Sequence, residues 1–341
     1  MGRRARATTT ISDVARECGV STMTVSRVIN GNKHVSADMA ERVHATIAKL
    51  NYQPNEAARI LRGQSSRTIG LLLPNLADIF FSQCAHAVQQ RAAQNGYTTM
   101  IFACEGDRES EAEELSIMQS RNIAGIVLVP SNRKLAPQLR QMRHAGVPIV
   151  TMDRTIPGLE AGEVLVENVE GAVLAVHHLI EHGHRRIACI GYDSEYDSIG
   201  SRIQGYQRVM QSAGLEPELL IVDKDSAVSP RLLARLHAPD APTALFTLNN
   251  VTSTEVLRTL QAEGYAVPGK IAIVGFDDFD LAPLLAVPLT AVRQPASKLG
   301  DCAAQMLLDS LQEGKRSNPQ RIVLPTMLII RNSCGCNLSA L

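Results

Sequence analysis

The sequence predicts a small all-helical N-terminal segment followed by a larger α/β body of parallel sheets flanked by helices. One observation is the distribution of charge. Residues 1–66 carry ten Lys and Arg against five Asp and Glu, and the rest of the chain carries 24 against 29, so the net charge of zero combines +5 with −5. The other is that short apolar runs alternate with amphipathic stretches beyond residue 66. Such alternation is typical of parallel sheets, and the charge asymmetry indicates an anionic partner for the N-terminal segment.

The composition excludes several classes of protein. Of the 341 residues, 45% are hydrophobic, which suits folded cores and argues against disorder. No apolar run approaches the roughly 18 residues of a membrane helix, and no apolar signal core follows the basic start. We therefore expect a cytoplasmic protein without membrane contact. The seven scattered cysteines fit reduced thiols better than a disulfide framework.

Capping residues predict three short helices in the N-terminal segment. Thr10, with Asp13 three positions later, begins the first helix, and Gly19 ends it. Ser21 and Ser36 begin the second and third helices. Two capped helices joined by a short turn form a helix-turn-helix.

The second of these helices has one packing side and one free side. Successive residues turn by about 100°, so Thr22, Met23 and Arg27 gather on the free side. The second helix of a helix-turn-helix fits the major groove of B-DNA, where an arginine can contact guanine with two hydrogen bonds. We therefore expect these three residues to contact bases.

Four motifs resemble the headpiece of the LacI/GalR family of bacterial repressors. They are TISDVA (10–15), GVS (19–21), TVSRVING (24–31) and YQPN (52–55). The resemblance implies that the segment after Tyr52 is a hinge helix that folds on operator DNA and pairs with its copy in a homodimer. Leu61 matches the family's leucine that inserts into the minor groove, and Asn55 and Ala58 match groove-lining positions. Thr22 and Met23 also resemble the gluconate-repressor branch.

The body contains eight expected strands, with helices between them. The strands are Ile69–Leu73, Thr98–Phe102, Ile123–Val129, Pro148–Met152, Arg186–Gly191, Leu219–Val222, Ala244–Leu248 and Ile271–Gly275. The family resemblance implies a two-lobed, periplasmic-binding-protein-like body in which the chain crosses between lobes near 162–164, 290–293 and 323–326.

These features predict the following domains. The headpiece is residues 1–53, the hinge helix and linker are 54–66, and the effector-binding and dimerisation domain is 67–333. Its first lobe is about 67–163 plus 292–324, and its second lobe is about 164–291 plus 325–333. We expect residues 334–341 to be a tail.

Polar and aromatic residues that follow the strands of the body predict a binding site. Ligands of open parallel sheets bind beyond the carboxyl ends of the strands. Through the resemblance, seven residues match effector-binding positions: Asp78, Phe80, Phe81, Asp153, Arg202, Asn249 and Asp277. A structural role is the alternative, with Arg202 and Asp277 in an ion pair, and Asp153 and Asn249 as turn or cap residues. Asn250 departs from the aspartate that relatives usually carry.

Two further motifs suggest metal or redox chemistry. The HLIEH run at 178–182 fits an H-x-x-E-H metalloprotease pattern, but Gly183 ends the helix at once, so we interpret it as a surface helix end. Cys334 and Cys336 lack a second cysteine pair or a histidine nearby in the sequence, and we expect them in a frayed tail. No hydrolase or phosphate-loop motif is present. We predict no metal site, no cofactor and no enzyme activity.

The sequence therefore predicts a homodimeric transcriptional regulator that binds a palindromic operator. We expect it to repress genes of carbohydrate or sugar-acid catabolism under the control of a sugar, a sugar acid or a similar polar metabolite. The alternative is a co-repressor-dependent or global regulator that responds to a nucleobase or another non-sugar ligand. A soluble sugar-binding protein would need a signal peptide, and an enzyme would need a nucleotide motif.

Overall fold

The computed structural model describes residues 9–29, 35–52, 66–104, 108–131, 133–192, 197–223, 226–313 and 319–336. The chain forms two compact units, Met1–Ser66 and Arg67–Leu341, and each is described by itself. Within the described ranges, every helix is too short or too polar to cross a bilayer.

The first unit contains α1 (Ile11–Cys18), α2 (Thr22–Ile29) and α3 (Ala37–Lys49). The predicted caps are confirmed: the hydroxyls of Thr10, Ser21 and Ser36 accept hydrogen bonds from backbone N–H groups in the first turns of the three helices. Gly19 ends α1 with a φ of 66°, in the left-handed region that glycine adopts without strain. The buried core consists of Val14, Ala15, Cys18, Val25, Val28 and Val43.

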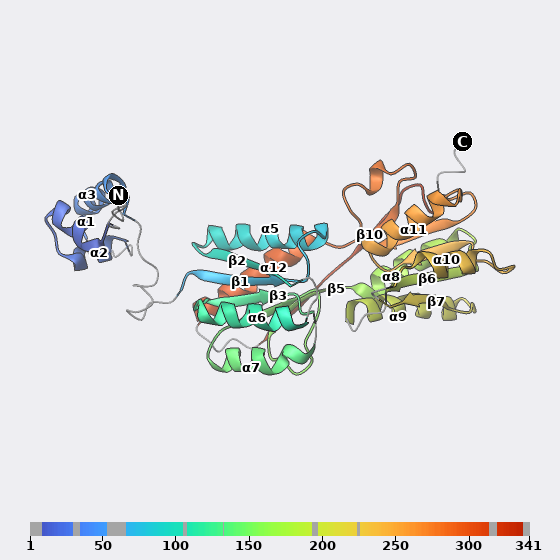
Figure 1. Cartoon of the computed structure of the whole chain (residues 1–341), viewed down its shortest axis with the longest axis horizontal. Helices are drawn as coiled ribbons and strands as arrows, with labels where there is room; N and C mark the ends of the chain where they lie inside the picture. The colour runs from blue at the N-terminus through green and yellow to red at the C-terminus, as the bar shows by residue number, and fades with distance from the viewer. Residues whose placement is uncertain are drawn as a thin grey trace, which may run out of the picture. The chain divides into compact units, whose positions relative to one another are not determined.

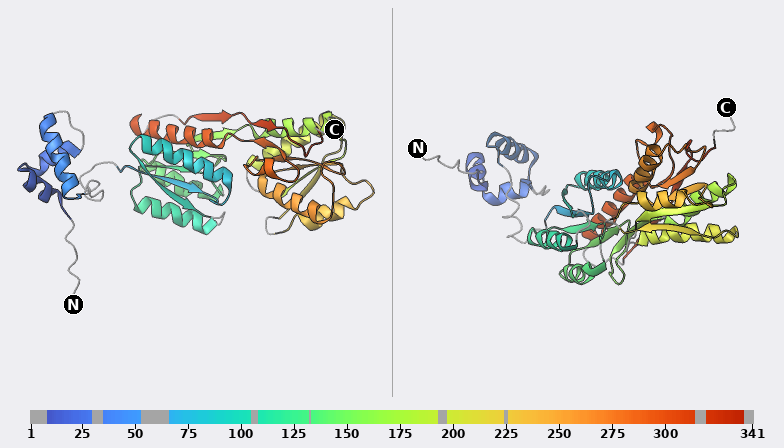
Figure 2. Two further views of the ribbon diagram at one scale, coloured as in Figure 1. Left: turned by 90° about the horizontal axis from the view of Figure 1, so that it is seen from above. Right: turned by 45° about the vertical axis from the view of Figure 1, so that its right-hand side comes forward.

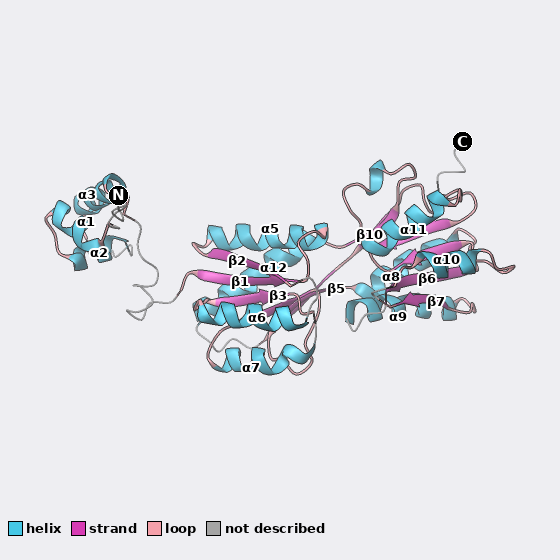
Figure 3. Ribbon diagram, in the orientation of Figure 1, coloured by secondary structure: helices cyan, strands magenta, loops and turns pink. Residues whose placement is uncertain are grey.

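The second unit consists of two lobes, each built on a six-stranded sheet (Figures 1 and 3). The first lobe contains β1 (Thr68–Leu73), β2 (Thr98–Ala103), β3 (Gly125–Leu128), β4 (Ile149–Met152), β5 (Gly162–Val166) and β11 (Arg321–Leu324), in the spatial order β11-β5-β4-β3-β1-β2. All its strand pairs are parallel. One face is covered by α5 (Ile79–Gln94) and α12 (Ala296–Glu313), and the other by α6 (Arg108–Ser120) and α7 (Ala136–His144).

The second lobe repeats this plan with one difference. It contains β6 (Ile187–Tyr192), β7 (Glu218–Val222), β8 (Ala244–Thr247), β9 (Ala272–Phe276), β10 (Thr290–Arg293) and β12 (Met327–Ile329), in the order β12-β10-β9-β8-β6-β7. Here the edge strand β12 is antiparallel to β10. One face is covered by α8 (Asn168–Glu181) and α9 (Asp197–Ser212), and the other by α10 (Ser229–Leu236) and α11 (Asn250–Ala262).

The chain passes between the two sheets three times: between β5 and α8, between β10 and α12, and between β11 and β12. Figure 2 shows these connections from two further directions. The first passage lies after Val166, a few residues beyond the expected 162–164, because β5 continues in register with β4 and β11. Cys334 and Cys336 are not in a frayed tail as expected, since Cys334 is 1% exposed and packs in the core of the second lobe.

A close helix contact holds α9, which carries Arg202, against the rest of the second lobe. Gly205 on α9 lies so near α8 that an added Cβ atom would be 2.4 Å from the carbonyl oxygen of Val169. A side chain at this position would push the two helices apart. The glycine thereby lets Arg202 reach the beginning of α8.

Candidate functional site

A cavity of about 370 Å³ lies at the carboxyl ends of strands from both lobes. All seven residues that the sequence suggested for effector binding line it: Asp78, Phe80, Phe81, Asp153, Arg202, Asn249 and Asp277. Seven further residues complete the lining: Arg154, Tyr192, Ser198, Ile199, Asn250, Val251 and Gln294. These residues lie together because the carboxyl ends of the parallel strands in each lobe face the same cavity.

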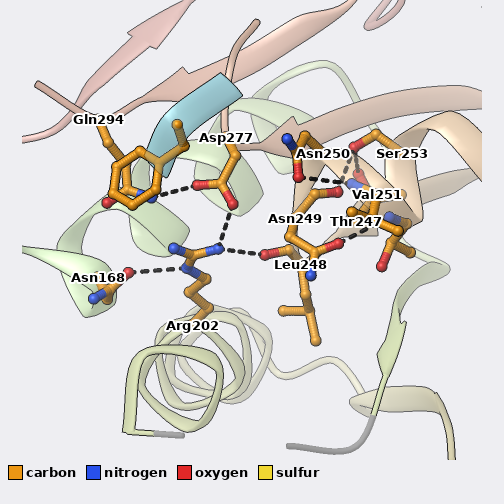
Figure 4. A network of polar contacts seen from close by, with 12 residues as sticks. Asn168, Arg202, Thr247, Leu248, Asn249, Asn250, Val251, Ser253, Asp277 and Gln294 are labelled. Atoms are coloured by element: carbon orange, nitrogen blue, oxygen red, sulfur yellow. Dashed lines mark hydrogen bonds and ion pairs between the residues drawn. The ribbon is translucent and has the colours of Figure 1, made fainter. Parts of the chain in front are cut away.

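Arg202 organises the wall that the second lobe contributes (Figure 4). Its Nε donates to Asn168 Oδ1 at 2.9 Å, and its Nη1 donates to the Leu248 carbonyl oxygen at 2.6 Å and to Asp277 Oδ2 at 2.9 Å. The guanidinium also lies 3.8 Å from the ring centroid of Phe276. Arg202 is 3% exposed, so these contacts take the place of water around a buried charge.

Asp277 connects this network to the passage between β10 and α12. Its backbone has a φ of 69°, a left-handed conformation that aspartate tolerates better than most residues. Its second carboxylate oxygen accepts a hydrogen bond from Gln294 Nε2, while the Oε1 atom of Gln294 is buried without a partner among the described residues. A buried acceptor of this kind is suited to receive a hydrogen bond from a ligand.

The wall that the first lobe contributes contains two carboxyl groups and an aromatic pair. Burial raises the pKa of Asp78 and of Asp153 above the usual carboxyl range. For Asp153, the guanidinium groups of Arg154 and Arg202 oppose this increase in pKa. The rings of Phe80 and Phe81 meet edge to face, with centroids 5.1 Å apart.

Asn249 and Asn250 have different roles, although they are neighbours. Asn249 caps α11, because its Oδ1 accepts from the backbone N–H of Thr252 at 2.8 Å. Asn250 Nδ2 donates to Asp78 Oδ1 at 3.1 Å, and this hydrogen bond joins the second lobe to the first. The cap role considered for Asn249 is thus present, and the same residue also lines the cavity.

The sequence interpretation missed two prominent lining residues, Gln294 and Tyr192. Gln294 directly follows β10. This strand has only four residues, and we interpreted its segment as a crossing between the lobes and not as a strand. Tyr192 is the last residue of β6, which we expected to end at Gly191. A longer strand assignment in each case would have placed both residues among the strand-end candidates.

The first unit presents the predicted base-contacting residues on its surface. Thr22, Met23 and Arg27 are exposed on α2, and the large apolar side chain of Met23 is 64% exposed. On the opposite side of the helix, Val25 and Val28 are buried. Asn55, Ala58 and Leu61 lie outside the described residues.

Comparisons with known proteins agree with this architecture. Residues 10–55 match the family described as bacterial regulatory proteins, lacI family, and residues 176–334 match the periplasmic binding protein-like domain. The chain is 32% identical over 330 residues to the HTH-type transcriptional repressor PurR of Vibrio vulnificus (strain CMCP6), covering 95% of this chain and 98% of that protein. It is 31% identical over 331 residues to the HTH-type transcriptional regulator DegA of Bacillus subtilis (strain 168), with the same coverage of 95% and 98%.

Solved structures resemble the chain over nearly its whole length. A Lac repressor dimer bound to operator and the anti-inducer ONPF superimposes with a TM-score of 0.83 at 26% identity, covering 96% of this chain and 99% of that one. A complex of the transcriptional regulator CelR with cellobiose gives a TM-score of 0.70 at 29% identity, covering 95% and 99%. A helix-turn-helix unit joined to a two-lobed periplasmic-binding-protein-like body defines a DNA-binding transcriptional regulator. The chain belongs to the lacI family of bacterial regulatory proteins.

Proposed function

We propose that this protein is a repressor that binds a palindromic operator as a homodimer and responds to a small polar molecule in the cavity between its lobes. The observation that carries the proposal is the pairing of an exposed recognition helix with a cavity whose buried wall is built around Arg202. The Lac repressor dimer bound to operator, which has the same overall fold, supports the dimeric arrangement.

The proposed DNA contacts use two parts of the N-terminal segment. Thr22, Met23 and Arg27 on α2 would meet base edges in the major groove. Leu61 would insert into the minor groove at the centre of the operator, and Asn55 and Ala58 would line that groove. Both contacts require two copies of the chain to read two half-sites.

A nucleobase is the first candidate for the effector. Phe80, Phe81 and Tyr192 supply aromatic surface for a flat ring, and Gln294 Oε1 is an acceptor for a ring N–H group. Several relatives carry the name PurR, which fits a purine better than the sugar that we expected from the sequence.

A sugar is the second candidate, because the CelR structure that resembles this chain is a complex with cellobiose. Hydroxyl groups could bond both to the carboxylates of the first wall and to the amide of Asn249. The two candidates differ in a measurable way, since a sugar needs hydroxyl contacts and a nucleobase needs a stacking partner.

A thermal-shift screen of purines, sugars and sugar acids tests the effector class. A ligand at about 100 times its dissociation constant should raise the melting temperature of the body by about 5 °C. We expect purines to do so and Phe80→Leu to weaken the effect. Stabilisation by sugars alone would replace the first candidate with the second. Operator affinity with and without the bound ligand then separates an inducer from a co-repressor.

Fluorescence anisotropy with operator DNA tests the recognition helix. Arg27→Ala should cost about 1–3 kcal/mol of operator binding and relax base preference at one position. Arg208→Ala, on the surface of the body, is the control and should change nothing. Leu61→Ala should weaken operator binding far more than nonspecific binding. An operator affinity that does not fall with rising salt would contradict the proposal, because phosphate contacts release counterions.

A further inference from the structure

Four side chains that bind soft metal ions meet in the second lobe, at the end of α8 away from the cavity. Cys336 Sγ lies 3.0 Å from His182 Nε2, 3.1 Å from His178 Nε2 and 3.0 Å from Cys334 Sγ. The two cysteines follow β12, and more than 150 positions separate Cys336 from either histidine. Only the fold brings the four residues together.

Each pair is held in place by the backbone that carries it. His178 and His182 are one helical turn apart on α8, so their rings lie on one side of the helix with centroids 4.3 Å apart. Between the cysteines, Gly335 has a φ of 90°, a conformation that allows the tight turn. Cys336 Sγ therefore contacts both rings, and the ligand atoms of His178, Cys334 and Cys336 all lie within 4.8 Å of one another.

The segment that carries the cysteines is anchored immediately before them. Ser333 Oγ donates to the carbonyl oxygen of Ile273 at 2.7 Å and accepts from the backbone N–H of Thr290 at 2.8 Å. The backbone N–H of Asn332 donates to the carbonyl oxygen of Pro288 at 3.0 Å. This part of the chain is therefore fixed against β9 and β10, in contrast to the frayed tail expected from the sequence.

Hydrogen bonds around the cluster leave the donor atoms ready for a metal. The Nδ1 atom of His182 lies 2.7 Å from the carbonyl oxygen of His178, and since a carbonyl can only accept, Nδ1 carries the proton. The lone pair is then on Nε2, which points at Cys336. Thr290 Oγ1 accepts from the backbone N–H of Arg331 and donates to Cys334 Sγ at 3.1 Å. Contacts of this kind orient the ligands of metal sites and tune their basicity.

We propose that His178, His182, Cys334 and Cys336 form a Cys2His2 site for Zn²⁺. In a tetrahedral zinc site with Zn–S bonds of about 2.3 Å and Zn–N bonds of about 2.0 Å, the ligand atoms are roughly 3.3–3.8 Å apart. The three separations around Cys336 are 3.0–3.1 Å, and His178, Cys334 and Cys336 offer ligand atoms that all lie within 4.8 Å of one another. His182 joins this group through its contact with Cys336, so a small spreading around Cys336 and a turn of the His182 ring would admit the ion. Two thiols release their protons on binding, and the two thiolates neutralise the ion, which suits a site in which His178 and Cys334 are buried.

Four protein ligands leave no open position, so the site would be structural and not catalytic. It would cross-link the C-terminal segment to α8, the helix whose first residue, Asn168, contacts Arg202 in the cavity wall. Glu181, the glutamate of the metalloprotease pattern at 178–182, pairs with His177 and is not a ligand of the proposed site.

Cobalt substitution in the full-length protein tests this proposal. Protein that has been reduced and freed of metal by a chelator is titrated with Co²⁺. We expect visible absorption of tetrahedral cobalt and a near-ultraviolet thiolate-to-cobalt band, which saturate at one ion per chain and disappear when Zn²⁺ is added. Zn²⁺ in excess should also raise the melting temperature by about 5 °C.

Matched variants distinguish the site from adventitious binding. Cys336→Ser and His182→Gln should each weaken Co²⁺ binding by at least about tenfold, and Cys336→Ser should also reduce the thiolate band. The controls are Cys302→Ser, a half-buried cysteine of the first lobe, and His177→Gln, an exposed histidine on the same helix. Both should bind like the native chain.

Two results would overturn the proposal. One is Co²⁺ binding that is absent, or that both site variants retain. The other is a mass lighter by two hydrogen atoms that persists in reductant and depends on Cys334 and Cys336, because the pair would then be a stable disulfide. Circular dichroism of each variant shows whether the fold is intact, and His182 is exposed, so its replacement leaves the core unchanged.

Discussion

The two walls of the cavity differ in how fully their charges are compensated. In the second lobe, the guanidinium of Arg202 bonds to a side-chain oxygen, a carbonyl oxygen and a carboxylate, all within the same lobe. In the first lobe, Asp78 and Asp153 are carboxyl groups whose pKa values burial raises. The charge of Arg202 in the second wall is therefore compensated without a ligand, whereas the carboxyl groups of the first wall retain a cost of desolvation.

This difference indicates how a ligand could shift the arrangement of the lobes. A molecule that donates hydrogen bonds to Asp78 or Asp153 would compensate the first wall while resting on the rigid second one. Such a ligand binds one arrangement of the lobes more tightly than the other, because only one arrangement brings both walls into contact with it. This difference in binding free energy shifts the equilibrium between the two arrangements. The following variants test the difference between the walls, beginning with the largest expected effect.

Arg202→Ala should lower the free energy of unfolding of the body by about 3–5 kcal/mol, because Asp277 would remain buried without its partner. Chemical denaturation followed by circular dichroism measures this loss. Arg208→Ala, six residues later on the same helix, removes a pair with Glu170 in which both side chains are more than half exposed, and should cost less than about 1 kcal/mol. Equal losses in the two variants would show that the Arg202 network is not the stabilising feature of the second wall.

Asp153→Asn should raise the free energy of unfolding at neutral pH, and by less than Arg202→Ala lowers it. Burial raises the pKa of Asp153 in the folded state, so the native protein loses stability as the pH rises above the usual carboxyl pKa, and the loss is complete above the raised pKa. Below the usual carboxyl range both chains should unfold alike, and toward pH 8 the variant should be the more stable. Asparagine also tolerates the φ of 66° at this position. A variant that becomes less stable than the native chain as the pH rises would mean that Arg154 and Arg202 outweigh the cost of burial.

The sequence predicted seven of the residues that line the cavity but not the Cys2His2 cluster, and the reason is physical. Residues at strand ends can be grouped before the topology is known, because parallel strands share one carboxyl edge. Gln294 was missed because four-residue β10 has too few positions to reveal a strand pattern. His182 and Cys336 are 154 positions apart in the sequence. They come into contact because the edge strand β12 runs antiparallel to β10, a strand direction that no local sequence pattern predicted. Local rules thus locate residues along a sheet edge, whereas contacts between distant segments require the full topology.

Asn249→Ala tests how much the cap of α11, in the second wall, contributes to stability. Its side chain caps α11, so its loss should cost about 1 kcal/mol of folding free energy. Asn249→Ser, which retains a capping oxygen, should recover most of this loss in the same denaturation experiment. If both variants are equally destabilised, the cap is not the main structural role of Asn249.

Asn250→Ala should have the smallest effect on stability, because it removes one hydrogen bond that joins the walls. The loss of the contact with Asp78 should cost about 0.5–1 kcal/mol. Its hydrogen bond also lowers the pKa of Asp78, so the variant should raise that pKa further and lose more stability at pH 8 than near pH 4. Denaturation midpoints at the two pH values measure this difference, with Asn249→Ala as the control that lacks it. A cost independent of pH would mean that Asp78 does not sense the second lobe, and the two walls would then act separately until a ligand joins them.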